Sequence, residues 1–212
     1  MIRNFIYIIS LFAISLHSFS QDQTLQVKVI IDQDDTQAKI DVFRCYLSNF
    51  QIQYSDGTRH QIDNSYHLID LEESESLMFK LSGLPEGKIE SVSFLIGTDS
   101  LVNVSGAFDG DLDPIYGMYW TWNSGYINIK LEGTKTNGSV IREFEFHIGG
   151  YSGEQATARK VSIDYVKNNE MSINIDLGKF LSVIDLDKTA MVMSPGKKAV
   201  MLADEFAKCV HE

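Results

Sequence analysis

The 212-residue sequence contains only two cysteines, Cys45 and Cys209, and neither belongs to a Cys-x-x-Cys pair or a Cys/His cluster. This spacing disfavours both a thiol redox site and a zinc knuckle. Two cysteines permit one disulfide in a compartment where disulfides persist, but a bridge requires Cα atoms within about 7 Å of each other. The sequence does not give that distance, so the pairing stays open.

Basic residues are also scarce, with 18 lysines and arginines against 29 aspartates and glutamates, which gives a net charge of -11. The acidic residues are spread along the chain and no basic cluster interrupts them. A protein that binds a phosphate backbone needs the opposite charge. We therefore expect no nucleic-acid partner.

Hydrolase motifs are missing as well. The chain has no Gly-x-Ser-x-Gly elbow and no His-Glu-x-x-His pair, and its histidines beyond the amino-terminal segment, His60, His67, His147 and His211, are scattered. We expect a protein that is not an enzyme.

Long apolar runs are limited to the amino terminus, where Arg3 precedes an apolar stretch from Phe5 to Leu16 and Ser18 and Ser20 follow it. This order is typical of a cleavable signal peptide, here residues 1–20. An uncleaved anchor is the alternative, but the run is shorter than the roughly 20 residues of a spanning helix. We expect residues 21–212 to form one exported domain without a membrane span, located in the periplasm or secreted.

The remaining sequence alternates between apolar and polar residues in short runs separated by Gly, Asn and Asp. Such alternation indicates strands, and many short strands without interleaved helices favour an all-β fold, an antiparallel β-sandwich. The predicted strands are Leu25–Ile31, Ala38–Tyr54, Ser76–Leu81, Lys88–Gly97, Tyr126–Gly133, Ser139–Gly149, Ala158–Val166 and Met171–Leu177. Asp56–Gly57 predicts a turn.

The carboxyl end departs from this pattern, because apolar residues at helical spacing follow Ser194-Pro195 and predict one short amphipathic helix. Just before it, Met191 and Met193 form a Met-x-Met pair that either binds copper or alternates along a strand, and we favour packing. On the Ser139–Gly149 strand we expect Phe144 and His147 to face opposite sides, and Phe144 and Phe146 likewise.

The segment from Gly110 to Tyr126 is rich in aromatic and acidic residues and fits neither period. Its rings either cap one end of the sandwich or, as exposed Trp and Tyr, stack on sugars. An EF-hand start at Asp109, Asp111 and Asp113 fails, because Pro114 and Trp120 stand where that calcium loop needs Gly and Glu.

Three blocks of this sequence resemble the MbnP-like family of exported bacterial copper-binding proteins. They are FLIGTDSLVN (Phe94–Asn103), GDLDPIYGMYWTWNSGYINIKLEG (Gly110–Gly133) and FEFHIGG (Phe144–Gly150). The resemblance extends over nearly the whole chain after residue 20, and the Met-Tyr-Trp-x-Trp-x-x-Gly-Tyr core is compositionally rare.

The resemblance implies a periplasmic or secreted β-sandwich that binds copper, as Cu(I) or Cu(II). In some members a tryptophan is oxidised to kynurenine by a partner dihaem peroxidase, and an outer-membrane copper-uptake protein is another implied partner. Imidazole and thioether suit Cu(I), whereas an intact indole has no free lone pair. The implied metal residues here are His147, His67, Met118, Trp120 and Trp122, with Asp111, Asp113, Tyr119 and Tyr126 as further binding residues.

Two functional hypotheses follow. The first is a non-catalytic, copper-handling protein whose ligands centre on His147 and the tryptophan loop. The second is a metal-free module that binds glycans or protein partners through the same Trp/Tyr loop.

Overall fold

The structure, a computed structural model, describes residues 22–34, 37–164 and 167–212. The predicted signal peptide, residues 1–20, lies outside the described residues. No helix of the described part is long and apolar enough to cross a membrane. The elements, in chain order, are β1 (Gln23–Asp32), β2 (Ala38–Tyr54), β3 (Arg59–Gln61), β4 (Tyr66–Asp70), η1 (Ser74–Leu77), β5 (Met78–Leu84), β6 (Ile89–Ile96), α1 (Ser100–Ser105), η2 (Gly110–Leu112), η3 (Pro114–Tyr116), β7 (Tyr119–Trp120), β8 (Gly125–Asn137), β9 (Val140–Gly149), η4 (Gly153–Gln155), β10 (Arg159–Ile163), β11 (Glu170–Asp176), α2 (Leu177–Ser182), β12 (Met191–Val192), α3 (Lys197–Ala207) and β13 (Val210–His211).

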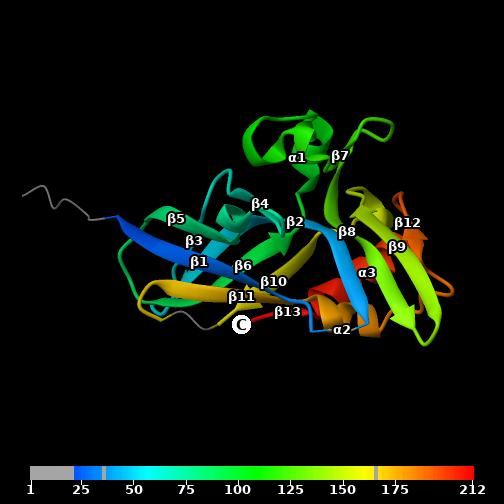
Figure 1. The fold of residues 1–212 in the computed structure, drawn as a ribbon. Coiled ribbons are helices and arrows are strands. Elements are labelled where there is room, and N and C mark those ends of the chain that lie inside the picture. The colour runs from blue at the N-terminus through cyan, green and yellow to red at the C-terminus, as the bar shows by residue number, and fades with distance from the viewer. Residues whose placement is uncertain (1–21, 35–36, 165–166) are drawn as a thin grey trace, which may run out of the picture.

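Two sheets form the sandwich (Figure 1). The smaller has the strand order β13-β11-β1-β5, and the larger has the order β10-β6-β2-β8-β9-β12, with β3 and β4 paired to β2 and β7 paired to β8. The all-β sandwich prediction is confirmed. Most pairs are antiparallel, and two pairs, β1 with β11 and β9 with β12, are parallel.

The main core, defined here as the apolar cluster between the two sheets, comes from strand alternation. In β2, Phe43, Cys45 and Leu47 are buried in it, and α2 and α3 contribute Phe180 and Phe206. The two aromatic rings from the helices pack edge to face at 5.3 Å between centroids. The predicted carboxyl-terminal helix is confirmed as α3, and α2 is an additional short helix.

Most predicted strands are confirmed within a few residues, and β2 has the predicted bounds. Residues 74–77 form a short 3-10 helix instead of the start of β5, and β4 is a strand that the pattern did not predict. On β9, Phe144 is buried in the main core and His147 lies on the opposite face, as predicted. The expectation that Phe144 and Phe146 are opposed is wrong, because residues two apart share a face; both rings are buried and stack at 5.6 Å.

Residues 99–124, which we call the lobe, project from the larger sheet as α1, two 3-10 helices and β7 (Figure 1). The lobe packs on the sheet face opposite the main core, which we call the outer face. There a second apolar cluster, the lobe cluster, forms from Tyr46, Leu68, Val102, Leu112, Met118, Trp120, Tyr126 and Ile127.

Candidate metal centre

His147 lies on the outer face of β9, and its Nε2 lies 2.7 Å from Oε1 of Glu132 on β8. Glu132 also forms an ion pair with Lys130 at 3.4 Å. Burial raises the pKa of Glu132, but the hydrogen bond with His147 and the charge of Lys130 outweigh it, so that the pKa lies below its ordinary value. A carboxylate in this position fixes the orientation of an imidazole ring, as do the carboxylates that hydrogen-bond to metal-binding histidines in other proteins.

The sheet register explains why these side chains meet. Lys130 on β8 pairs with His147 on β9, and Arg44 on β2 pairs with Lys130, so all three project from the outer face. The side chain of His147 is only 12% exposed although it points away from the main core. Nδ1 of its ring has no hydrogen-bond partner among the described residues, which leaves that nitrogen available to a metal.

Trp120 lies beside this histidine because its ring packs on Gly149, two residues farther along the same face of β9. A Cβ added at Gly149 would lie 2.7 and 2.8 Å from two ring carbons of Trp120, so the indole requires a glycine there. Trp120 is 6% exposed and Trp122, at the tip of the β7–β8 turn, is 64% exposed. Their ring centroids are 5.6 Å apart. The structure thus brings His147, Trp120 and Trp122 to one region of the outer face.

Met118 and the two predicted tyrosines have packing positions. Met118 is fully buried in the lobe cluster. The hydroxyl of Tyr126 donates to the carbonyl of Leu112 and accepts from the backbone N–H of Phe108, at 3.0 and 3.1 Å. The ring of Tyr119 packs edge to face on Tyr126. These side chains hold the lobe onto the sheet.

The two predicted aspartates act on the backbone. Asp111 Oδ2 accepts a hydrogen bond from the N–H of Leu68 at 2.9 Å, which ties the lobe to β4. Asp113 caps the 3-10 helix η3 by accepting from the N–H of Ile115. Within the described residues there is no group of three or more His, Cys, Asp or Glu side chains that could hold a metal.

His67 is not close to His147 in the fold, because the two lie on opposite faces of the larger sheet. On β4 it pairs with Leu47, a residue of the main core, and its ring stacks on Phe79 with centroids 3.8 Å apart. Burial lowers the pKa of His67, and the nearby Asp111 carboxylate offsets only part of this effect. The cysteines are likewise separate from the site: Cys45 and Cys209 are both buried and free, so the possible disulfide does not form.

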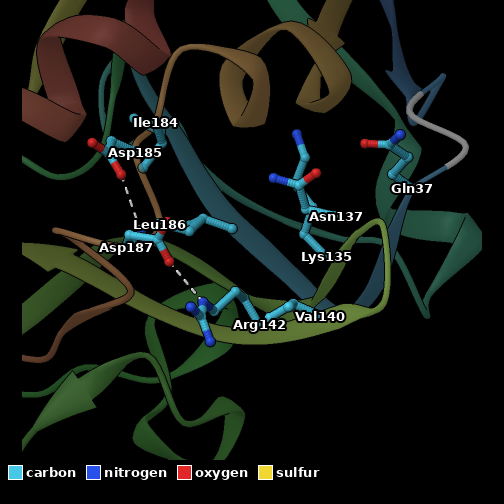
Figure 2. A pocket seen from close by; sticks show the side chains of 9 residues that line it. All are labelled: Gln37, Lys135, Asn137, Val140, Arg142, Ile184, Asp185, Leu186 and Asp187. Carbon is cyan, nitrogen blue, oxygen red and sulfur yellow. Dashed lines mark hydrogen bonds and ion pairs between the residues drawn. The ribbon is translucent and has the colours of Figure 1, made fainter.

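Two pockets lie away from His147. One, of about 680 Å³, lies between β4 and the lobe and is lined by His67, Phe108, Asp109 and Asp111 among others. The other, of about 330 Å³, lies where the β8–β9 hairpin meets the segment after α2, with Arg142 Nε 2.8 Å from an Asp187 oxygen (Figure 2). The second pocket contains none of the predicted site residues.

The packing that we favoured for Met191 and Met193 is wrong, since they are 65% and 37% exposed. The alternation along a strand is present, because Met191 is exposed and Val192 is buried in β12. β12 pairs in parallel with β9, with Met191 beside Glu145 and Val192 beside Phe146. Val192 takes the buried position, so Met191 is directed to the outer face, and Met193 follows one residue after the end of β12.

The chain is similar to known proteins both in sequence and in fold. The family model MbnP matches residues 10–194, most of the chain. The chain belongs to the MbnP family. A solved structure described as MbnP from Methylosinus trichosporium is similar to it with a TM-score of 0.59 and 15% identity, covering 82% of this chain and 81% of that one. At this identity the likeness shows a shared fold. A comparison with curated proteins gives no match.

In this MbnP-family chain, sequence reasoning missed Glu132, Lys130 and the glycine under Trp120. Lys130 and Glu132 alternate with the apolar residues Ile129 and Leu131 in the YINIKLEG run, and this alternation places them on the outer face. The Gly149 contact is with Trp120, 29 residues earlier in the chain, and no local signal reports it. The exposure of the Met-x-Met pair depends on a two-residue strand that is too short to show a period.

Proposed function

We propose that this protein is an exported, non-catalytic copper-handling protein that binds copper on the outer face of β8 and β9. The observation that carries the proposal is the position of His147: Glu132 holds one ring nitrogen, the other is unpartnered among the described residues, and Trp120 packs two residues away on Gly149. Family membership supports metal handling. An imidazole suits copper in either oxidation state.

The test is a titration of the purified protein with Cu(I) against a competing chelator. We expect His147→Ala to weaken copper binding by on the order of 10- to 100-fold or more, because loss of even an outer-shell partner costs that much. His60→Ala is the matched control, since His60 lies on β3 at the far end of β2 and should leave the affinity unchanged. Binding no stronger than weak surface sites, or equal binding by wild type and His147→Ala, would end the copper proposal.

Oxidation of one tryptophan by a partner dihaem peroxidase is part of this proposal, and exposure favours Trp122 over Trp120 as its target. Two molecules of hydrogen peroxide would each give one oxygen atom across the C2–C3 bond of the indole and leave as water. Hydrolysis would then release C2 as formate and leave kynurenine, whose amine and carbonyl can coordinate copper. Mass spectrometry of protein from its native host should find kynurenine at Trp122. Unmodified tryptophans in copper-loaded native protein would contradict this step.

A second candidate is a metal-free binding module, and one observation favours it. The lobe presents large apolar side chains to solvent, and the adjoining pocket of about 680 Å³ falls in the size range of ligand sites. These exposed residues are Leu101, Val104, Phe108, Ile115, Tyr116 and Trp122. The same surface suits docking of the peroxidase or of an outer-membrane copper-uptake partner. Isothermal titration with glycans, in protein that binds no copper, separates this candidate from the first.

A further inference from the structure

At the edge of the larger sheet, β12 lies beside β9, the strand that carries His147 (Figure 1). Met191 and Met193, in and just after β12, are both exposed. Met191 pairs in register with Glu145, and Glu145 and His147 occupy successive positions on the outer face of β9. In a parallel pair, residues in register project to the same side, so Met191 lies on the outer face with Glu145. β12 ends at Val192, and extending its register by one residue puts Met193 at the level of His147.

The residues on either side of Met193 are held against β9. Before it, Val192 is buried in the main core opposite Phe146. After it, Pro195 lies against the end of β9, since a Cβ added at Gly150 would be 3.2 Å from the Cβ of Pro195. The Met-x-Met pair is therefore held along the segment of β9 that carries His147. The same segment contains Gly149, on which the Trp120 ring packs.

We propose that Met191, Met193 and Nδ1 of His147 form a Cu(I) site that needs no oxidised tryptophan. This inference rests on the proposed function and deepens it by naming the sulfur ligands. Thioether and imidazole are neutral, soft to intermediate donors, and they favour Cu(I) over Zn(II) or Cu(II). The Glu132 carboxylate, bonded to the other nitrogen of the same ring and 3.4 Å from the Lys130 ammonium, supplies one negative charge close to the site.

The tryptophans give this site a further property. An aromatic face attracts a cation placed over it, and the attraction is stronger where water is excluded. Trp120 is buried on the face of β9 that carries His147. The ring centroid of Trp122 lies 5.6 Å from that of Trp120, and Trp122 is mostly in solvent. Of the two rings, Trp120 is the one that excludes water next to His147, because Trp122 is mostly in solvent.

The experiment uses the chain from residue 21 onward, expressed without partner proteins and shown by mass spectrometry to have two intact tryptophans. Cu(I), Cu(II) and Zn(II) are each titrated anaerobically against a competing chelator. The test variant is Met191→Leu/Met193→Leu, since leucine keeps the apolar volume and removes the sulfur. The control is Met78→Leu/Met201→Leu, which removes two exposed thioethers on β5 and α3.

We expect the unmodified protein to bind Cu(I) more tightly than Cu(II) or Zn(II). The test variant should lose on the order of 10- to 100-fold in Cu(I) affinity, with no loss in the control. X-ray absorption of the Cu(I) complex should show sulfur and imidazole scatterers, and the sulfur shell should vanish in the test variant.

The outcomes separate this inference from the proposed function. If the test variant binds Cu(I) as tightly as wild type while His147→Ala does not, the thioether site is wrong and the copper function stands. If wild type binds no Cu(I), or if His147→Ala binds as well as wild type, the proposed function fails and the thioether site fails with it.

Discussion

The main core and the lobe cluster are two apolar regions on opposite faces of one sheet, and they are built by different rules. The main core is assembled from alternating strand positions and two helices, with residues such as Phe43 and Phe206 fully buried. The lobe cluster combines side chains of the lobe with side chains of β2, β4 and β8, and its rings fit against specific partners, as Trp120 fits against Gly149. The comparison teaches that regular alternation makes the scaffold, while individual contacts place the side chains next to His147.

The largest expected effect belongs to the main core. Phe206→Ala removes a fully buried ring that stacks on Phe43 and packs edge to face on Phe180, and should lower the free energy of unfolding by about 3–5 kcal/mol. Urea denaturation measures this. The folded fraction should keep the copper affinity of wild type, because the ring lies on the other face of the sheet from His147. A loss of copper affinity in the folded protein would show that the two regions are not separate.

Within the lobe, the two tryptophans form a matched pair. Trp120→Phe should cost about 1–3 kcal/mol, since the buried ring loses its fit over Gly149. Trp122→Phe should change stability by no more than about 0.5 kcal/mol, because this side chain is mostly in solvent. Thermal denaturation of both variants checks the difference. An equal loss of stability in the two variants would mean that the Trp120 ring is not packed on Gly149 as described.

Two tyrosines of the lobe cluster, Tyr126 and Tyr46, differ in whether their hydroxyl groups form hydrogen bonds. Tyr126→Phe breaks two hydrogen bonds and should cost about 1–2 kcal/mol. The Tyr46 hydroxyl is buried without a hydrogen-bond partner among the described residues. Its removal in Tyr46→Phe should therefore be neutral or should stabilise the fold by up to about 1 kcal/mol. A clear loss of stability in Tyr46→Phe, measured by urea denaturation, would indicate a partner at this hydroxyl.

The smallest effect is a pH dependence at His67. Because burial lowers its pKa in the folded protein, the unfolded chain takes up the proton first as the pH falls below 6.5. The stability that the neutral His67 ring contributes is thus fully present above pH 6.5. It is lost as the pH falls from 6.5 to the lower pKa that His67 has in the folded protein. His67→Phe, which keeps a ring on Phe79, should reduce the decline in stability from pH 7 to 5. If stability declines as steeply from pH 7 to 5 in His67→Phe as in wild type, His67 is not the source of the decline.

The contrast between the main core and the lobe cluster also explains which features could be predicted from the sequence. β2 and β9 were predictable because one of their faces is buried and the residue period of two is visible over many residues. The family blocks led to His147 and the two tryptophans. The separation of His67 from His147 was not predictable, since it depends on which strand β4 joins and in which register. The exposure of Met191 and Met193 likewise depends on tertiary pairing with β9.

The central claim is that ligand binds on the outer face beside the lobe and leaves the main core unaltered. Hydrogen–deuterium exchange with mass spectrometry, with and without Cu(I), tests where binding occurs. The account predicts slower exchange in residues 117–124, 145–150 and 191–196, and unchanged exchange in β1, β5 and β11. Protection confined to the pocket of Figure 2, or to the β1–β11 sheet, would contradict it.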